Sequence, residues 1–208
     1  MQELLNQLLL QLSEQSYLEL VAVILALAYV WLAAKQNSWC WPCALLSTAI
    51  YTYLFWEVTL PFHVLLNVYY MLMAIYGWRQ WQGPSSKVLP VTSWRGKQHI
   101  LCIALLMAGS FLLSKGISSV FDEQYLYLDA SITIFSLFTT VLVAHKVREN
   151  WIYWIVIDLF SAYLFFAKGL VLTSLLFLLY TFFAFYAYMQ WGKDTQVDGL
   201  TGAQKHAQ

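Results

Sequence analysis

Charged side chains are scarce in this chain of 208 residues. Asp, Glu, Lys and Arg make up 11% of the sequence, whereas hydrophobic residues make up 61% and aromatic residues 18%. Soluble domains contain about 25% charged residues, so this composition indicates an integral membrane protein. The net charge is zero. Nucleic-acid binding requires a basic surface, and we expect no nucleic-acid partner.

Sequence motifs of enzymes and metal sites are also missing. The chain contains no Gly-x-Ser-x-Gly, no His-Glu-x-x-His and no glycine-rich phosphate loop. Cys40, Cys43 and Cys102 lie in apolar segments without a second pair of ligands, so we interpret them as small apolar residues. The N-terminal segment "MQELLNQLLLQLSEQSY" lacks Lys and Arg, and we expect no signal peptide there. The sequence therefore predicts a protein that is not an enzyme and holds no metal or cofactor.

Seven apolar segments are candidates for transmembrane helices, which need about 20 mostly apolar residues. They are residues 17–34, 39–56, 61–81, 98–114, 126–145, 151–167 and 170–191. Residues 2–15 have the pattern of an amphipathic helix on the membrane surface. Residues 82–97 combine Gly, Pro, Ser and charge and indicate a loop, and a polar tail follows the last span. The predicted fold is an all-α integral membrane protein with seven spans.

The basic residues predict the orientation of these spans, because Lys and Arg concentrate in cytoplasmic loops. With the N-terminus outside, only Lys115 and Lys168 would face outward, and the other nine of the 11 basic residues would face inward. These nine are Lys35, Arg79, Lys87, Arg95, Lys97, Lys146, Arg148, Lys193 and Lys205. We therefore expect an external N-terminus and a cytoplasmic C-terminus.

The chain also contains an internal repeat. When Tyr17 is placed on Tyr127, residues 17–81 align with 127–191 without a gap. The identical pairs include Trp41 with Trp151, Tyr70 with Tyr180, and Gln80-Trp81 with Gln190-Trp191. We interpret this as a duplication of a three-helix unit. The fourth span restores the direction of the chain, so the two units would be parallel repeats about an axis along the membrane normal, with a substrate site between them.

This 3+1+3 arrangement is that of the SWEET-like sugar-efflux transporters. It divides the chain into five predicted parts. They are an amphipathic segment (1–16), a first repeat (17–81), a loop and linker helix (82–126), a second repeat (127–191) and a polar tail (192–208).

Polar residues within the spans identify a candidate substrate site, because each costs a few kcal/mol in the membrane and needs a reason to be there. Asp158 lies about two turns into the sixth span, on the helix face of Trp151 and Trp154. In the third span, His63, Asn67 and Tyr70 share a face. The second span contributes Trp41, Thr48 and Thr52, and the seventh contributes Tyr180. Such indole, phenol, amide and carboxylate groups suit a flat, polar and cationic ring rather than a phosphate.

Other polar and aromatic residues have simpler interpretations. Glu19 and Asp129 begin equivalent spans, where a negative charge is favoured by the helix dipole. For a single Tyr or Thr, a bond between helices is a common alternative to ligand contact. The tryptophans at predicted interfaces are interpreted as aromatic-belt anchors: Trp39, Trp78, Trp81 and Trp191.

The sequences "IYGWRQW" (75–81) and "ENWIYW" (149–154), together with the 3+1+3 layout, resemble the Pnu-type vitamin transporters. The resemblance covers roughly residues 17–193. It implies facilitated diffusion of an unphosphorylated vitamin across a bacterial inner membrane, trapping of the vitamin by a cytoplasmic kinase, and a homotrimer.

The resemblance also bears on the substrate. Family members that carry nicotinamide riboside typically have Gln and Asn where this chain has Asn67 and Ala74, and Asn in place of Asp158. The added carboxylate favours a cationic ring that bears an amino group, so the sequence predicts thiamine, with nicotinamide riboside as the alternative and riboflavin-type substrates third. A seven-helix scaffold or receptor-like protein is the alternative from another class. The duplication favours transport, because two-fold repeats support alternating access.

Overall fold

The computed structural model describes residues 16–57, 61–82, 89–118 and 125–205, together with Asn6 and Gln11. From Tyr17 onward the described residues form seven long helices, as predicted. They are α2 (Tyr17–Ala34), α3 (Cys40–Glu57), α4 (Pro61–Trp81), α5 (Gly96–Ile117), α6 (Leu126–Ala144), α7 (Asn150–Ala167) and α8 (Val171–Lys205). Most of the predicted surface helix at 2–15 and part of the predicted loop, 83–88, lie outside the described residues.

Five of these helices are long and apolar enough to cross a membrane. They are α2, α5, α6, α7 and the stretch Val171–Lys193 of α8. The helices α3 and α4 have 18 and 21 residues, but their Thr, Tyr and Trp side chains and the Asn67 amide make them less apolar. The chain is therefore an all-helical, multi-pass membrane protein. The last helix continues past residue 191 into the polar segment predicted as a tail.

Helix boundaries recur along the chain at the spacing of the sequence repeat. The start of α3 at Cys40 corresponds to that of α7 at Asn150, and the start of α4 at Pro61 corresponds to that of α8 at Val171. The turns before α3 and α7 each contain a non-glycine residue with positive φ, Gln36 at 53° and Lys146 at 52°. These two residues are also equivalent in the repeat. The same rare backbone conformation therefore occurs at both places that the sequence repeat equates.

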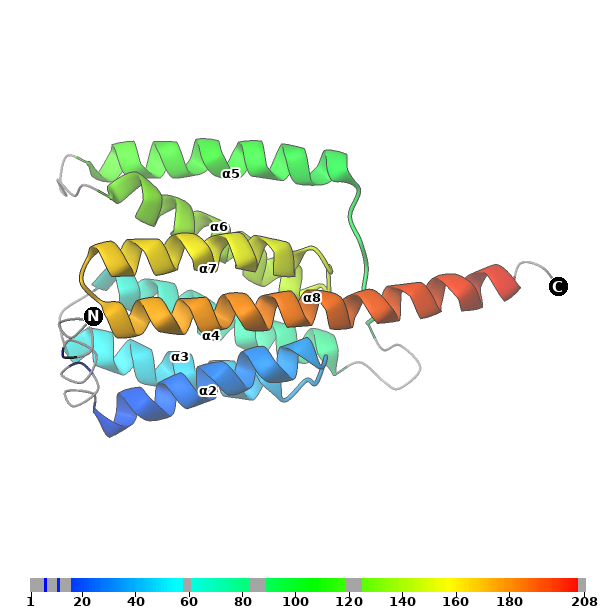
Figure 1. Cartoon of the computed structure of the whole chain (residues 1–208), viewed down its shortest axis with the longest axis horizontal. Helices are drawn as coiled ribbons and strands as arrows, with labels where there is room; N and C mark the ends of the chain where they lie inside the picture. The colour runs from blue at the N-terminus through cyan, green and yellow to red at the C-terminus, as the bar shows by residue number, and fades with distance from the viewer. Residues whose placement is uncertain are drawn as a thin grey trace.

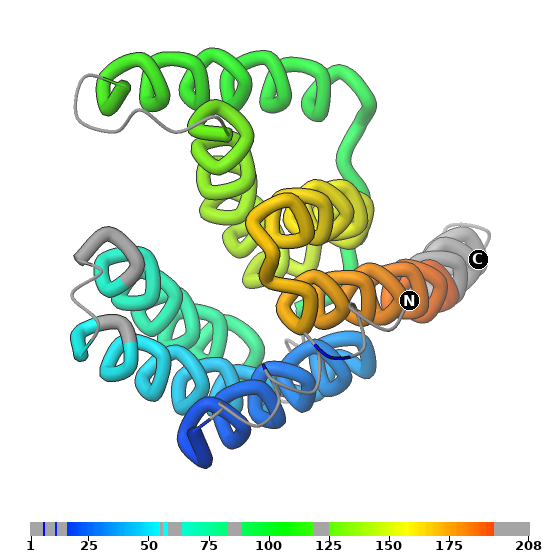
Figure 2. Tube along the Cα trace, turned by 60° about the vertical axis from the view of Figure 1, so that its left-hand side comes forward, coloured from blue at the N-terminus to red at the C-terminus, as the bar shows by residue number. Residues whose placement is uncertain are grey.

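The helices form two groups joined by α5 (Figures 1 and 2). Helix α3 packs against α2 and α4 in one group, and α7 packs against α6 and α8 in the other. The groups meet where α2 contacts α8 and where α4 contacts α6. Helix α5 packs chiefly against α6, and it lies along the edge of the bundle (Figure 1).

The largest hydrophobic core lies at the end of the bundle where α2 and α6 end, on the right in Figure 1. We call this the basic end, because Lys35, Arg79, Lys146 and Arg148 lie there. At its centre is a tryptophan cluster formed by Trp41, Trp81, Trp151 and Trp191, which are at most 7% exposed. The ring centroids of Trp41 and Trp81 are 5.3 Å apart, those of Trp151 and Trp191 5.4 Å, and those of Trp81 and Trp191 6.0 Å.

The prediction that Trp81 and Trp191 are aromatic-belt anchors is therefore wrong. The Trp81 indole N–H donates to the Ala144 carbonyl of α6, and the Trp191 indole N–H donates to the Ala33 carbonyl of α2, both at 3.1 Å. Each bond crosses between the two helix groups and ends at a carbonyl in the last turn of a helix, where the donor within that helix is missing. The Ala33 carbonyl also accepts from the Gln36 N–H at 2.9 Å. Trp81 and Trp191 therefore connect the two helix groups and are not anchors at the lipid headgroups.

The described part of the predicted loop is held against the basic end. Thr92 forms a parallel bridge with Val147, in which its N–H donates to Lys146 O and its carbonyl accepts from Arg148 N. The Glu149 carboxylate accepts hydrogen bonds from Ser93 Oγ and from the Trp94 N–H. The segment before α5 is thus fixed to the turn between α6 and α7.

Candidate functional site

A buried carboxylate in α7 is the centre of the candidate site. Asp158 is 4% exposed, and Trp151 on the same helix is 3% exposed, so the helix face predicted from spacing points into the protein. Trp154 is half-buried and packs against the core of the basic end. Neither α6 nor α7 contains a Lys or Arg that could neutralise Asp158. Burying such a carboxylate is costly, which makes the position a candidate for a functional role.

Two tyrosines from opposite helix groups approach this carboxylate. Tyr70 in α4 and Tyr180 in α8 are equivalent in the repeat, and both lie close enough to Asp158 to interact with it electrostatically. Ser136 in α6, which is 5% exposed, also lies close to Tyr70. Asn67, which is 8% exposed, precedes Tyr70 by nearly one turn and lies on its face of α4. We call Asp158, Tyr70, Tyr180, Ser136 and Asn67 the aspartate site.

Further tyrosines surround the aspartate site. Tyr51 of α3 lies within electrostatic range of Tyr180, and Tyr29 of α2 within that of Tyr70. Helices α2, α3, α4, α6, α7 and α8 therefore all place polar side chains around one region. These residues come from both helix groups; that they bind a substrate stays a prediction.

Two buried indoles have unused hydrogen-bond donors. The N–H groups of Trp41 and Trp151 are buried and have no hydrogen-bond partner among the described residues. These two tryptophans are equivalent in the repeat. A buried donor without a partner is unfavourable, so an acceptor from a bound solute or water would stabilise both. They lie in the tryptophan cluster, on the basic-end side of the aspartate site.

The remaining predicted site residues are placed differently. Thr48 donates to the carbonyls of Ala44 and Leu45, and Thr52 donates to the Thr48 carbonyl, so both hydroxyls bond to their own helix. Thr52 also lies 3.6 Å from Met71 Sδ. The side chain of His63 lies outside the described residues.

Sequence reasoning missed several residues of this region, namely Tyr29, Tyr51, Ser136, Trp81 and Trp191. Tyr51 and Ser136 carry no sequence signal, because single Tyr and Ser residues in spans are common. Trp81 and Trp191 did carry a sequence signal. They match each other in the repeat, and their equivalence points to a shared role between the repeats.

The chemistry of the site suits recognition rather than catalysis. Phenol and indole faces attract a cationic ring, and the carboxylate supplies a counter-charge. Helices α2, α3, α6 and α7 contain no Lys or Arg to bind a phosphate. Among the described residues, no group of three His, Cys, Asp or Glu side chains is placed to hold a metal ion.

Comparisons with known proteins bear on this interpretation. Residues 16–193 match the family described as nicotinamide mononucleotide transporters. The nicotinamide riboside transporter PnuC of Escherichia coli (strain K12) is 23% identical over 204 residues, covering 85% of each chain, and the protein of that name from Shigella flexneri matches equally. The crystal structure of the vitamin B3 transporter PnuC matches with a TM-score of 0.70 and 21% identity, covering 93% of this chain and 88% of that one.

Proposed function

Because the chain belongs to the nicotinamide mononucleotide transporter family, that of the PnuC proteins, we propose that it carries the unphosphorylated vitamin nicotinamide riboside across the membrane. The family predicted from the sequence is confirmed, and the chain is a membrane transporter of the PnuC vitamin-transporter type. The relatives are described as nicotinamide riboside transporters, which favours the alternative substrate over thiamine.

The burial of the Asp158 carboxylate, which is 4% exposed, carries this proposal, and Tyr70 and Tyr180 lie within its electrostatic range. Nicotinamide riboside contains a pyridinium ring with a permanent positive charge. The Asp158 carboxylate would pair with that charge, and the phenol and indole faces would stack on the ring. The argument that Asp158 disfavours the riboside therefore fails, because thiamine and nicotinamide riboside are both cations. A phosphorylated nucleotide suits the site poorly, because its phosphate would lie near the carboxylate.

Transport would use the internal repeat. The recurring helix starts and the paired positive-φ residues support two parallel repeats, 17–81 and 127–191, with α5 as the linker in a SWEET-like arrangement. The aspartate site takes Tyr70 from one repeat and Asp158 and Tyr180 from the other, so relative motion of the repeats would expose it to each side in turn. The tryptophan cluster closes the basic end in this structure. This supports a state in which the basic end is shut.

The cellular setting completes the proposal. We place the basic end in the cytoplasm of a bacterial inner membrane, because Lys and Arg concentrate there. Uptake would be facilitated diffusion, with a cytoplasmic kinase that traps the vitamin as its phosphate. By resemblance to the family, the transporter would be a homotrimer.

Thiamine remains a second candidate because of one observation. Ala74, which stands where riboside carriers typically have Asn, is 2% exposed and packed in the core of the basic end. The chain thus lacks one amide expected to bind a carboxamide or ribose. The thiazolium ring and aminopyrimidine of thiamine could still interact with the Asp158 carboxylate.

Titrations of the purified transporter test both substrates. We expect nicotinamide riboside to bind wild type more tightly than thiamine. Asp158→Asn keeps the shape of the side chain but removes its charge, so it should weaken riboside binding about 10- to 100-fold. Reduced nicotinamide riboside has a similar shape but no charge on its ring, so Asp158→Asn should weaken its binding much less.

The outcomes separate the candidates. Tighter binding of thiamine by wild type would reverse the choice of substrate. Equal losses for the riboside and its reduced form would show that Asp158 acts through shape and not through charge. Unchanged binding of every ligand by Asp158→Asn would remove the aspartate site from the proposal.

A further inference from the structure

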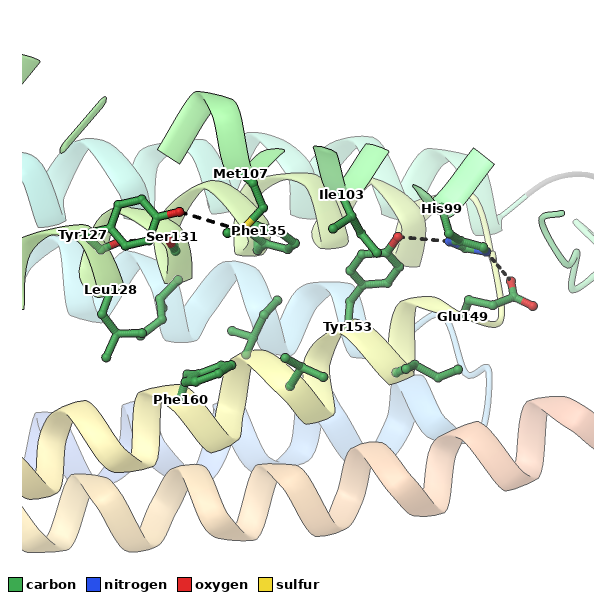
Figure 3. A pocket seen from close by; sticks show the side chains of 14 residues that line it. His99, Ile103, Met107, Tyr127, Leu128, Ser131, Phe135, Glu149, Tyr153 and Phe160 are labelled. Carbon is green, nitrogen blue, oxygen red and sulfur yellow. Dashed lines mark hydrogen bonds and ion pairs between the residues drawn. The ribbon is translucent and has the colours of Figure 1, made fainter. Parts of the chain in front are cut away.

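A cavity lies outside the proposed transport path. It has a volume of about 560 Å³ and is lined by side chains of α5, α6 and α7, including Ile103, Phe135, Val156 and Phe160. Figure 3 shows these helices around it, with His99, Tyr153 and Glu149 at the basic end and Tyr127 and Met107 toward the other. The aspartate site contributes no residue to this lining. The cavity is therefore separate from the proposed path.

Most polar groups of this cavity bond within the protein, but His99 Nε2 is buried without a hydrogen-bond partner among the described residues. His99 Nδ1 is 3.0 Å from the Tyr153 hydroxyl, and Ser131 Oγ donates to the Tyr127 carbonyl. The Glu149 carboxylate accepts from Ser93 and Trp94, and one of its oxygens lies 3.9 Å from His99 Nε2. The remaining walls are apolar. A polar solute such as the transported vitamin would find few partners there, whereas a hydrocarbon chain would fill the space.

The cavity is at least as deep as one leaflet of a bilayer, because its lining reaches from Glu149 at the basic end to Tyr127 and Leu128 in the first turn of α6, at the other end. Its lining on α7 extends from Glu149 to Phe160, which at 1.5 Å per residue is about 16 Å. Half of a hydrocarbon core about 30 Å thick is about 15 Å. One acyl chain of the leaflet at the basic end would thus fit within the length of the cavity, parallel to the helices.

Positive charge marks the mouth of the cavity. Arg95 is the N-cap residue of α5, and Lys97 lies in its first turn beside His99 at the basic end of the cavity; both are exposed. The first N–H groups of α5 add a partial positive charge at this point. Basic groups beside a membrane on this side attract anionic headgroups. We propose that the cavity between α5, α6 and α7 binds an anionic phospholipid, with one acyl chain inside and the phosphate at Arg95 and Lys97.

The test compares phosphatidylglycerol with phosphatidylcholine of the same acyl chains, added to the purified full chain in detergent. Phosphatidylglycerol at about ten times its Kd should raise the apparent melting temperature by about 3–6 °C. Native mass spectrometry should show the lipid retained. The double variant Arg95→Gln/Lys97→Gln should weaken its binding about five-fold per charge. Lys115→Gln removes a charge at the other end of α5 and should bind like wild type.

A second pair of variants tests the acyl chain. Val156→Trp would fill the cavity, whereas Leu159→Trp lies on the same helix, is also 48% exposed and does not line it. We expect only Val156→Trp to abolish stabilisation by phosphatidylglycerol. Equal effects of both lipids on wild type, or full stabilisation of Val156→Trp, would overturn the proposal. An oligomer that dissociates in Val156→Trp but not in Leu159→Trp, without any lipid effect, would assign the cavity to a second copy of the chain instead.

Discussion

At the scale of single residues, the Trp41 ring restricts position 77 to glycine. A Cβ at this position of α4 would overlap the buried six-membered ring of Trp41. The equivalent position in the second group of helices is Ala187, which is fully buried and accommodates its methyl group. The close approach of α3 to α4 therefore depends on the absence of one methyl group.

We expect Gly77→Ala to destabilise the protein by about 1–3 kcal/mol, because the Trp41 ring must move within a packed core. Thermal unfolding in detergent measures the effect. Ala187→Gly is the matched control, with an expected cost of about 0.5–1 kcal/mol from helix propensity. If Gly77→Ala unfolds at the wild-type temperature, the contact between Trp41 and α4 is looser than described.

The Trp81 indole offers a second residue-scale prediction. Trp81→Phe keeps an aromatic ring but leaves the fully buried Ala144 carbonyl without its donor, at a cost of about 1–3 kcal/mol. Trp39→Phe changes a tryptophan that is 64% exposed and should cost less than about 0.5 kcal/mol. Chemical or thermal unfolding of both variants gives the comparison. Equal losses would contradict the role of Trp81 as a bond between helix groups.

At the scale of helices, most of the architecture follows from the sequence. The predicted spans 61–81 and 151–167 agree with α4 and α7 within a residue, because apolar runs and their polar breaks fix where a chain can cross a membrane. The inward face of α7 follows from the spacing of Trp151 and Asp158. The bridge between Thr92 and Val147 does not, because residues this distant in sequence are paired by the tertiary fold.

The candidate site is only partly predictable, for a physical reason. Helical spacing shows which residues share a face, as for Asn67 and Tyr70, but not whether a hydroxyl bonds within its own helix, as Thr48 does. A tryptophan at a helix end has the same local sequence whether it contacts headgroups or another helix. The sequence pattern therefore misassigns Trp191, whose partner, Ala33, lies near the other end of the chain.

The N-terminal segment is tied to α8 through one side chain. Gln11 Nε2 donates to the Gly169 carbonyl, and Gln11 Oε1 accepts from the Leu172 N–H, both at 2.9 Å. Gln11→Ala should remove both bonds and release an N–H in the first turn of α8, at a cost of about 1–2 kcal/mol. Hydrogen exchange at Leu172 should accelerate. Asn6→Ala, at an exposed position, is the control, and equal exchange in both variants would contradict the contact.

At the scale of the whole molecule, the two helix groups must separate at the basic end if the proposed transport cycle is correct. Tyr76 of α4 and His145 beyond α6 bond across this junction at 3.1 Å. In a background without native cysteines, a bismaleimide joining Tyr76→Cys to His145→Cys should abolish uptake into liposomes. The same reagent joining Trp39→Cys to Trp78→Cys, a pair within one group at the same end, should leave uptake intact. Uptake by the first crosslinked pair would refute opening at this end.

Facilitated diffusion predicts that uptake needs no ion gradient. Asp158 is the deeply buried carboxylate of the described spans, and no chain of acidic residues within them leads from it to either end. Uptake into liposomes that contain a trapping kinase should persist when ionophores collapse the proton and sodium gradients. A loss of uptake under these conditions would indicate coupling to one of them.

The tryptophan cluster also has an optical consequence. Its four indoles are at most 7% exposed, and neighbouring rings lie within 6.0 Å, so their fluorescence originates in a dry environment. Indole emission shifts to longer wavelength when water reaches the excited ring. Any motion that separates Trp81 from Trp191 would therefore change the colour of the emitted light. The protein thus contains an intrinsic fluorophore at the junction that the proposed cycle would move, so this cycle could be followed in real time without an attached dye.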